Sequence, residues 1–566
     1  MTTPPDTARL RGLRQGLRDL RPEPGTLRSD LVAGVPGAIS SVPDGMAASL
    51  LAGVNPVHGL YAGIFGRIGG GLTASSRLMV ITTTSAAALA AGSALTSVPF
   101  DERPRSLFLL TVVAGIAMVA AGVLRFGRYV RFVPHSVMIG FLTGIAANIV
   151  LGQLAHLCGA EVSGPFALAK AWDLVTHPGL IEPASLAAGL LALAILFGLA
   201  RTRLAAYASL VAVVVPTAVA LAVGATSIAQ VDDTGEIPTG LPAPYVPHLS
   251  DLSFDLVTGA LAVAALVLIQ GAGVSESAPN PDGSRSVTNR DFVAQGVGNV
   301  LAGLFRGQPV GGSVGQTAVS VAAGARGRWA AISAGVWLAV ILVALSGVVG
   351  QVLMPTLAAV LIAAAIGSLR TGDFRAILRT GRVSQVAVIT TLVATLLLPV
   401  AAAVGLGVAL SLLMQLNQEA LDLRIVALDP DDAGRFHERE APTVLPSRAV
   451  TLLDVYGSLF YAGARTLQAH LPDPTGAQRP AVVLRLRGRA MLGATAFVVL
   501  SDYARRLAEV DGRLYLSGVA PEVLEQLHRN ATVEEAGEVR VFEATTTVGE
   551  SSTEAYRAAQ AWIARG

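Results

Sequence analysis

The sequence predicts a polytopic α-helical membrane protein with two inverted seven-span repeats, followed by a small cytosolic α/β domain. Three observations predict this fold: an apolar composition, arginines that alternate between the connections, and a matched pair of interrupted apolar segments. Of the 566 residues, 52% are hydrophobic and 14% are charged, and the mean hydropathy is +0.59. Soluble domains carry roughly 25% charged residues, so the composition excludes a soluble multidomain enzyme.

Charge, cysteine content and motifs exclude several further classes. A net charge of +2 does not fit a basic nucleic-acid binder. The single cysteine, Cys158, excludes a disulfide framework and a zinc ribbon. The sequence has no metal-ligand cluster, Walker loop or catalytic-triad spacing, so we expect no cofactor, no ATP-driven transport and no enzymatic activity.

The charged residues divide the chain into three regions. Residues 29–422 contain 37 of the 80 charged residues and residues 423–566 contain 34. These counts are about 9% and about 24% of the two regions, and only the second is typical of a soluble domain. We therefore expect a cytosolic N-terminal arm (1–28), a transmembrane domain (29–422) and a cytosolic domain (440–566).

Fourteen segments in the middle region are candidates for crossing a bilayer, which requires roughly 20 apolar residues. The clearest nine are 104–124, 132–155, 184–200, 205–224, 256–274, 329–350, 354–368, 384–400 and 401–418. Five more are interrupted by glycine or polar residues, and these are 30–50, 54–73, 79–97, 291–305 and 313–324. Helix breaks at membrane depth survive where they line an enclosed cavity, so the interrupted segments are the candidates for a functional site.

Arginine positions predict the orientation of the spans. The connections after spans 4, 6, 8, 10 and 12 are basic, and their arginines are Arg125, Arg128, Arg131, Arg201, Arg203, Arg285, Arg290, Arg326, Arg328, Arg370, Arg375, Arg379 and Arg382. The connection after span 7 is acidic. Cytoplasmic loops carry the excess of basic residues, so we expect both termini in the cytoplasm.

The acidic connection separates two repeats, 29–225 and 255–422, and each has a short third span after a polar stretch. Paired interrupted segments at corresponding positions mark a transporter site. If both half-helices begin near the midplane, their free N–H groups and dipoles form an anion site. The expected site residues are Thr82, Thr83, Thr84, Ser85, Pro309, Val310, Gly311, Gly312, Ser313 and Gln316. Alternatively, glycine and alanine serve only close helix packing.

Polar residues inside other spans add candidates. Asp44 suggests a proton or ion site, or alternatively a cap on a helix broken at Pro43. Gln270 could bind substrate or join two helices. Glu276, near the inner end of span 8, is expected in a gate or interface, with a role in proton coupling as the other option.

The C-terminal region alternates predicted strands with predicted helices. Alternating apolar residues predict strands at 449–458, 481–487, 513–517 and 538–543, and amphipathic patterns predict helices at 494–509, 520–529 and 552–564. This order is typical of an α/β domain with a mostly parallel sheet.

Two long motifs resemble the sulfate permease family of anion transporters, which carry a C-terminal STAS domain. The first runs from Asp30 to Tyr61 and includes Pro43, Pro56 and Gly59-Leu60-Tyr61; the second runs from Asn289 to Pro309 and continues at Gly324-Ala325-Arg326. The resemblance implies core and gate subdomains, a homodimer, elevator-like movement and, for a bacterial member, the inner membrane.

The sequence departs from the family pattern at several site positions. Asp44 stands where Gln is frequent, Thr82-Thr83 where Gly-Pro is frequent, and Gln270 where an acid is frequent. Gln316 replaces a basic residue, so the expected site lacks a fixed cation. Asp44 could instead couple the anion to a proton, with Na+ as the other candidate ion. Thr495 matches the phosphoacceptor of the STAS domain, but Gly493 replaces the acid before it, so docking is favoured over phosphorylation.

The predicted function is secondary active transport of a small anion. A dicarboxylate such as fumarate or succinate, moved by proton symport, is the first expectation. The alternatives are bicarbonate or sulfate transport, a nucleobase–proton symporter, and a passive anion channel or sensor. Neither the anion nor the dimer surface follows from the sequence.

Overall fold

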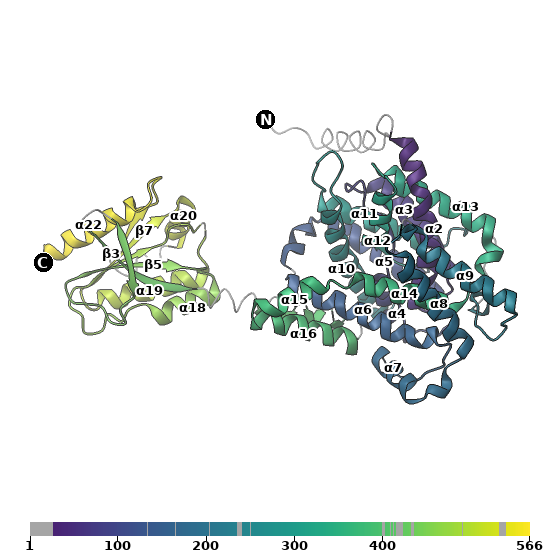
Figure 1. Cartoon of the computed structure of the whole chain (residues 1–566). Coiled ribbons are helices and arrows are strands. Elements are labelled where there is room, and N and C mark those ends of the chain that lie inside the picture. Colours follow the sequence, from purple (N-terminus) through teal and green to yellow (C-terminus); the bar gives the residue numbers. More distant parts are fainter. Residues whose placement is uncertain are drawn as a thin grey trace. The chain divides into compact units, whose positions relative to one another are not determined.

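The chain forms two compact units, residues 1–411 and 412–566 (Figure 1). The computed structural model describes residues 26–132, 134–164, 166–202, 204–234, 240–248, 251–398, 402–403, 405–407, 409–410, 413–414, 423–431, 435–489, 491–530 and 539–565. Most of the expected N-terminal arm therefore lies outside the described residues.

The first unit is helical apart from two three-residue strands. Its α-helices are α2 (Leu27–Ala52), α3 (Val57–Thr73), α4 (Ser85–Ala94), α5 (Arg103–Val123), α6 (His135–Leu157), α7 (Ala167–Thr176), α8 (Pro183–Leu199), α9 (Ala208–Val223), α10 (Phe254–Ser277), α11 (Thr288–Leu304), α12 (Val314–Ala322), α13 (Trp329–Val349), α14 (Met354–Ser368), α15 (Thr371–Thr380) and α16 (Arg382–Leu397). The strands are β1 (Ile81–Thr83) and β2 (Val310–Gly312), and the 3-10 helices are η1 (Phe126–Phe132), η2 (Pro178–Leu180), η3 (Ala205–Tyr207) and η4 (Val231–Thr234).

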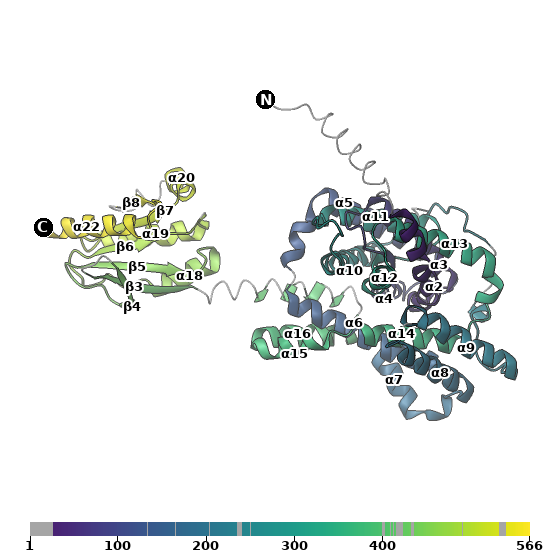
Figure 2. The same ribbon diagram turned by 45° about the horizontal axis from the view of Figure 1, so that its top comes forward.

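These helices pack in two groups. The first group contains α2, α3, α4, α5, α10, α11, α12 and α13, and the second contains α6, α7, α8, α9, α14, α15 and α16. The groups are visible as two neighbouring bundles (Figure 1, Figure 2). Each group contains helices from both predicted repeats, so the chain passes between the groups more than once.

Glycines allow the first group to pack closely. A Cβ atom placed on Gly59 of α3 would lie 1.8 Å from the carbonyl oxygen of Gly45 in α2. Gly115 of α5 and Gly296 of α11 approach each other's backbone in the same way. Small residues at helix crossings let the backbones of two membrane helices come into contact. Here the crossing of α2 and α3 places Asp44, next to Gly45, close to α3.

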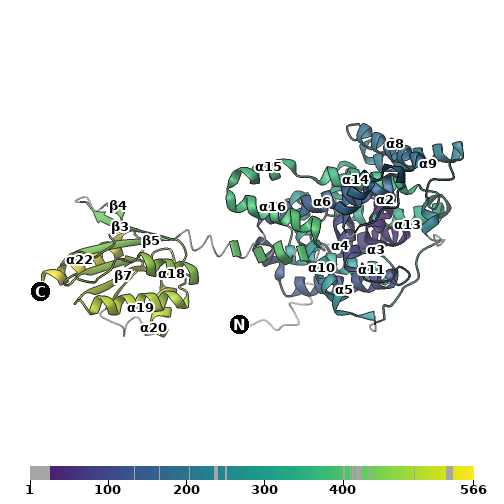
Figure 3. The same ribbon diagram turned by 90° about the horizontal axis from the view of Figure 1, so that it is seen from below.

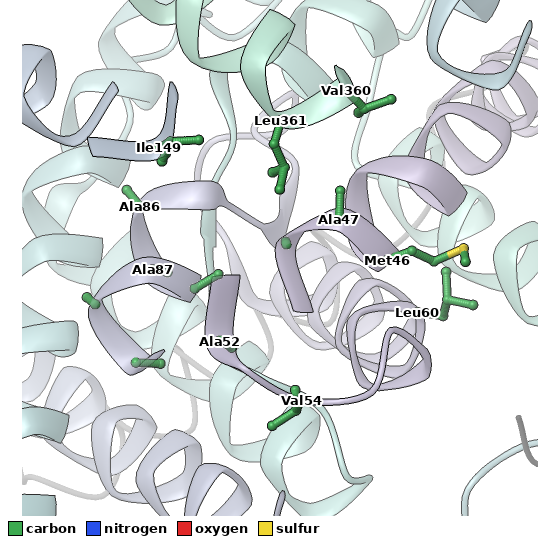
Figure 4. Close-up of a cluster of buried hydrophobic side chains, with 14 of the residues drawn as sticks. Met46, Ala47, Ala52, Val54, Leu60, Ala86, Ala87, Ile149, Val360 and Leu361 are labelled. Carbon is green, nitrogen blue, oxygen red and sulfur yellow. The ribbon is translucent and has the colours of Figure 1, made fainter. Parts of the chain in front are cut away.

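The two groups meet along small and aliphatic side chains. Figure 4 shows Ala47 of α2 near Leu361 of α14, and Ala86 of α4 near Ile149 of α6. All four side chains belong to one buried cluster. The contact between α2, α4 and the second group is therefore apolar and closely packed.

A test of length and hydropathy finds fewer spans than the fourteen expected. Among the described residues, α5, α6 and residues Phe254–Ser275 of α10 pass, and the pair α14 and α15, bent by 41°, could form a fourth span. Helices α4, α8, α9, α16 and residues Trp329–Ala344 are apolar but shorter. Thirteen expected segments nevertheless overlap helices, and half of the fourteenth, 401–418, lies outside the described residues.

The second unit is a six-stranded sheet covered by helices on both faces. Its strands are β3 (Arg424–Pro430), β4 (Phe436–Glu440), β5 (Val450–Tyr456), β6 (Ala481–Arg485), β7 (Arg513–Val519) and β8 (Val539–Glu543), in the order β4-β3-β5-β6-β7-β8. Strands β5 to β8 are parallel, and β3 and β4 pair antiparallel. Its helices are α18 (Tyr461–His470), α19 (Ala494–Ala508), α20 (Pro521–Asn530) and α22 (Glu550–Ala564).

Alternation along β6 explains the two layers. Val482 and Leu484 are buried in the cluster that contains α18, α19 and α20, whereas Ala481 and Val483 are buried with α22. Successive side chains of a strand point to opposite faces. Figure 3 shows α19 and α20 along one side of the sheet.

Apart from the 3-10 helices and the short strands β1 and β2, five elements were not expected from the sequence, and one of them is α18, which lies between two expected strands. Helices α7 and α15 lie in segments expected to be connections, and β3 and β4 precede the expected start of the soluble domain at residue 440. Helices α7 and α15 have charged residues among apolar ones, so a search for apolar spans does not find them. Strand β4 is mostly exposed, so it lacks the alternation that reveals a half-buried strand.

Candidate functional site

The two short strands form a buried antiparallel ladder in the middle of the first group. Ile81 faces Gly312, Thr82 faces Gly311 and Thr83 faces Val310, and all six residues are buried. Helix α4 begins two residues after β1 and helix α12 two residues after β2. Because the strands are antiparallel, the two helices begin at opposite ends of the ladder and run away from it.

Buried amides from α11 fix the position of β2. Asn299 accepts a hydrogen bond from the Val310 N–H at 2.9 Å and donates to the Val310 carbonyl at 2.7 Å. Gln295 accepts from the Gly312 N–H at 3.2 Å. Both amides are fully buried, and a buried amide that satisfies the main chain also holds it in one place.

Hydroxyl caps define where each half-helix begins. The Thr84 hydroxyl accepts from the Ala87 N–H at 3.2 Å, and the Ser313 hydroxyl accepts from the Gln316 N–H at 3.3 Å. A cap of this kind leaves the first two N–H groups of a helix without an intrahelical acceptor. In α12 these belong to Val314, which is 47% exposed, and Gly315, where an added Cβ would meet nothing within 4 Å.

A buried polar network lies against the first turn of α12. The Gln316 side-chain nitrogen donates to the Asp44 carboxylate at 2.6 Å. The Arg67 guanidinium donates to the Gln316 side-chain oxygen at 2.8 Å and also contacts the Ser41 hydroxyl. Arg67 is 1% exposed, so a buried cation lies beside the first turn of α12, which the sequence interpretation did not expect.

The partners determine the orientation of the Gln316 amide. Arginine can only donate, so the Gln316 oxygen must face Arg67 and its nitrogen must face Asp44. The hydroxyls of Ser40 and Ser41 also lie 3.2 Å from this oxygen. Gln316 therefore connects a carboxylate to a guanidinium at the N-terminus of a half-helix.

Asp44 does not cap a broken helix. Helix α2 runs without interruption from Leu27 to Ala52 and contains both Pro36 and Pro43. The alternative interpretation of Asp44 as an N-cap after Pro43 is therefore wrong. Its carboxylate contacts a side chain 272 positions further along the chain.

Two of the predicted polar residues have a side-chain oxygen that is buried and unpaired. The Thr82 hydroxyl and the Gln270 side-chain oxygen find no hydrogen-bond partner within the described part of the chain. Thr82 is 1% exposed. Leaving such a group unpaired costs about 1–3 kcal/mol, so each is suited to binding a polar ligand or water.

Gln270 also lines an apolar pocket. The remaining lining residues come from α6, α10, α16 and residues 403–407, and they are Val137, Met138, Phe141, Leu142, Leu266, Ile269, Thr391, Ala403 and Gly407. Gly273, one turn along α10 from Gln270, has open space where a Cβ would lie. The pocket thus lies between α10 of the first group and α6 and α16 of the second.

The structure brings most of the predicted site residues together. Residues 82–85, 309–313 and 316 belong to the ladder and its two half-helices, and Asp44 joins them through Gln316. Gln270 faces the pocket instead of this hydrogen-bond network. Glu276 is near the carboxyl end of α10, but its side chain lies outside the described structure. Thr495 is in the first turn of α19 in the second unit.

Arg67 is the principal residue that the sequence interpretation missed. It lies inside the expected span 54–73, and an arginine within a span is a functional candidate by itself. The sequence interpretation used only the arginines in the connections between spans, so it missed Arg67 inside a span. Ser40, Ser41, Gln295 and Asn299 were also missed, because neutral polar residues are common at helix contacts.

Known proteins identify the family of the chain. Residues 27–394 match the model of the sulfate permease family. The "Putative sulfate transporter YvdB" of Bacillus subtilis (strain 168) is 24% identical over 91% of this chain and 96% of its own. The "Bicarbonate transporter BicA" of Picosynechococcus sp. is 23% identical over 89% and 90%.

A solved structure agrees with this match over nearly the whole chain. The murine solute carrier 26 family member A9, an anion transporter solved in the inward-facing state, has a TM-score of 0.85 and 18% identity, covering 99% of this chain and 96% of its own. This likeness shows a shared helical membrane transporter fold. Together with the family match, it shows that the chain belongs to the sulfate permease family, whose members are membrane anion transporters and not enzymes.

Proposed function

We propose that the chain is a secondary active transporter of a small inorganic oxyanion, with sulfate as the first candidate and bicarbonate as the second. The names of the relatives support these two anions better than the dicarboxylate expected from the sequence. Sulfate is placed first because the site carries more positive charge than the sequence indicated.

The proposed anion site is the space between the N-termini of α4 and α12. The observation that carries it is the buried β1–β2 ladder, from whose two ends the capped half-helices α4 and α12 begin. The unpaired Thr82 hydroxyl adds a donor there. Helix N-termini bind anions through free N–H groups and their dipoles.

The proposed driving ion is the proton, bound by Asp44. A carboxylate inside a membrane domain is costly unless it has a function or a partner. Asp44 contacts Gln316 in the first turn of α12, so its charge acts directly at the proposed anion site. Sodium coupling is the alternative.

The proposed architecture has fourteen spans in two inverted repeats, with both termini in the cytoplasm of a bacterial inner membrane. In each repeat a strand and a short helix follow the second long helix, which supports the internal symmetry. The two helix groups suit a core and a gate that move past one another. The C-terminal unit is proposed to be a STAS domain and the protein a homodimer.

Uptake into proteoliposomes tests this function. Purified protein is reconstituted and supplied with labelled sulfate, bicarbonate, succinate, fumarate, chloride and uracil. We expect saturable uptake of sulfate or bicarbonate, and accumulation against a gradient separates a transporter from a passive channel. Thr82→Val should raise the KM for the anion about tenfold, because a tenfold change corresponds to the binding free energy of about one hydrogen bond. Thr258→Val, on the exposed surface of α10, is the matched control. Uptake of uracil alone, or of none of these solutes, contradicts the proposal.

A further inference from the structure

The Asp44–Gln316–Arg67 network combines two opposite charges and one bridging amide. Gln316 lies between them, with its nitrogen on Asp44 at 2.6 Å and its oxygen receiving Arg67 at 2.8 Å. Asp44 and Arg67 are electrostatic partners of each other. The Arg67 guanidinium contacts Gly37 and Ser41 of α2. Its contact with α12 is through the Gln316 side chain, so it acts on the proposed anion site through that side chain.

Few other titratable groups lie near this pair. Helices α4, α9, α12, α13 and α14 pack against α2 and contain no titratable side chain. Helix α3 contributes His58 and Tyr61 besides Arg67, and η3 contributes Tyr207. His58 is at the other end of α3 and is held by the Arg306 carbonyl at 2.8 Å. Proton binding at Asp44 therefore controls the net charge of this region.

The total charge near the half-helices can be counted. A helix N-terminus is equivalent to roughly half a positive charge, so α4 and α12 together contribute about one. Arg67 adds one more. The region thus carries about +2 when Asp44 is protonated and about +1 when Asp44 is ionised. A dianion balances the first state and a monoanion balances the second.

We propose that Asp44 and Arg67 form a charge switch, acting through Gln316, that makes the site accept a dianion together with a proton and a monoanion without one. Arg67 is a positioning residue in this switch, because it orients Gln316 and supplies the opposing charge without touching the anion. The inference rests on the proposed function and adds the charge class of the substrate.

The pH dependence of this switch follows from linkage. A protonated Asp44 leaves the buried Arg67 charge uncompensated, and such a charge is costly until an anion binds. Proton binding and anion binding therefore favour each other reciprocally. Coulomb energy scales with the charge of the ligand, so a dianion must respond to pH about twice as strongly, on a logarithmic scale, as a monoanion.

Anion-induced thermal stabilisation of the purified full-length protein tests the switch. Sulfate and nitrate are the probes, because sulfate stays a dianion and nitrate stays a monoanion between about pH 5.5 and about pH 8. As the pH rises over this range, we expect the apparent Kd to increase about tenfold for sulfate and about threefold for nitrate. Arg128→Gln, which removes an exposed arginine, should leave both responses unchanged.

Variants separate the switch from a structural role of the two residues. Asp44→Asn should bind sulfate at high pH as tightly as the wild-type protein does at low pH, with no pH dependence. Arg67→Gln should weaken sulfate binding at low pH about tenfold, and Arg67→Lys should restore part of it. The double variant Asp44→Asn/Arg67→Gln has no charge to compensate, so it should fold even if Arg67→Gln does not, and it should bind sulfate weakly at every pH.

The outcomes distinguish this inference from the proposed function. Equal pH responses for sulfate and nitrate, or a wild-type response retained in Arg67→Gln or Asp44→Asn, overturn the charge switch and leave the transport proposal standing. Tight, pH-independent sulfate binding by the double variant also overturns the switch. A wild-type protein that neither anion stabilises at any pH contradicts the proposed function itself.

Discussion

The Gln316 side chain donates a hydrogen bond to the Asp44 carboxylate at 2.6 Å, although 272 positions separate the two residues in the chain. This bond joins α2, in the first predicted repeat, to the first turn of α12, in the second. The half-helix proposed to bind the anion and the acid proposed to bind the proton are thereby in direct contact.

Replacement of Gln316 by glutamate should make stability depend on pH. The new carboxyl group would keep its contact with Arg67 but would face the Asp44 carboxylate, and two carboxyl groups at this distance can bond only while they share a proton. We expect Gln316→Glu to unfold at a lower temperature at about pH 8 than at about pH 5.5. Gln351→Glu, at an exposed position, is the control. Equal unfolding temperatures for Gln316→Glu at both pH values would show that the bond is unimportant.

The crossing of α2 and α3 should not tolerate a methyl group. Gly59→Ala would place a carbon 1.8 Å from the Gly45 carbonyl oxygen, so the helices must separate. We expect the unfolding free energy to fall by about 1–3 kcal/mol and uptake to fall with it, because Asp44 is adjacent to Gly45. Gly198→Ala in α8 has nothing within 4 Å and should be neutral or slightly stabilising. A stable, active Gly59→Ala would refute the close crossing.

Asn299 should matter for the ladder more than for the fold as a whole. Asn299→Leu removes both bonds to Val310 and leaves a buried N–H and carbonyl unpaired, at a cost of about 1–3 kcal/mol for each group. Sulfate should then fail to raise the unfolding temperature. Asn299→Asp keeps the acceptor for the Val310 N–H, so sulfate should still raise the unfolding temperature of this variant by part of the wild-type amount. Full stabilisation of Asn299→Leu by sulfate would separate the ladder from anion binding.

Asp473 should give the second unit an acid-sensitive stability. The Thr475 N–H and hydroxyl hydrogen-bond to this carboxylate, and together with Arg506 they hold its pKa below the usual value. A carboxyl group with a lowered folded-state pKa stabilises the fold above its unfolded pKa of about 3.9, and this contribution disappears as the pH falls through the folded value.

The fluorescence of Trp562 can follow this transition, because the guanidinium groups of Arg479 and Arg513 in the second unit lie over the Trp562 ring. The background protein has Trp172, Trp329 and Trp337 replaced by phenylalanine, so that Trp562 is its one tryptophan. In this background, the stability of Asp473→Asn should depend less on pH below about pH 4 than the stability of the protein that keeps Asp473. Identical acid unfolding curves would contradict a role for this carboxylate.

The sequence contained enough information to predict the two half-helices, but not that the stretches before them pair as the β1–β2 ladder. Hydroxyl, glycine and proline residues interrupted two apolar segments at corresponding positions, and these are the residues that cap a helix or open a strand. The parallel strands β5 to β8 were likewise predicted, because each shows alternating or continuous apolar residues.

The network around Gln316 could not be predicted in the same way. Its members belong to α2, α3 and α12, and no local pattern specifies which polar residues of three separate helices will meet. Arg67 carried a signal of its own as a charge inside a span, but its partner could not be identified without the fold. The helix α2 also continues through Pro43, because neighbouring helices can compensate for the lost main-chain bond.

Proton-driven accumulation of sulfate tests the central claim most directly. Proteoliposomes containing the wild-type protein or Asp44→Asn are given an inward proton gradient with labelled sulfate at equal concentration on both sides. The account predicts that the wild-type protein accumulates sulfate above the external concentration, whereas Asp44→Asn only exchanges it at equilibrium. Equal uphill accumulation by both proteins, or none by the wild-type protein with any oxyanion, would contradict it.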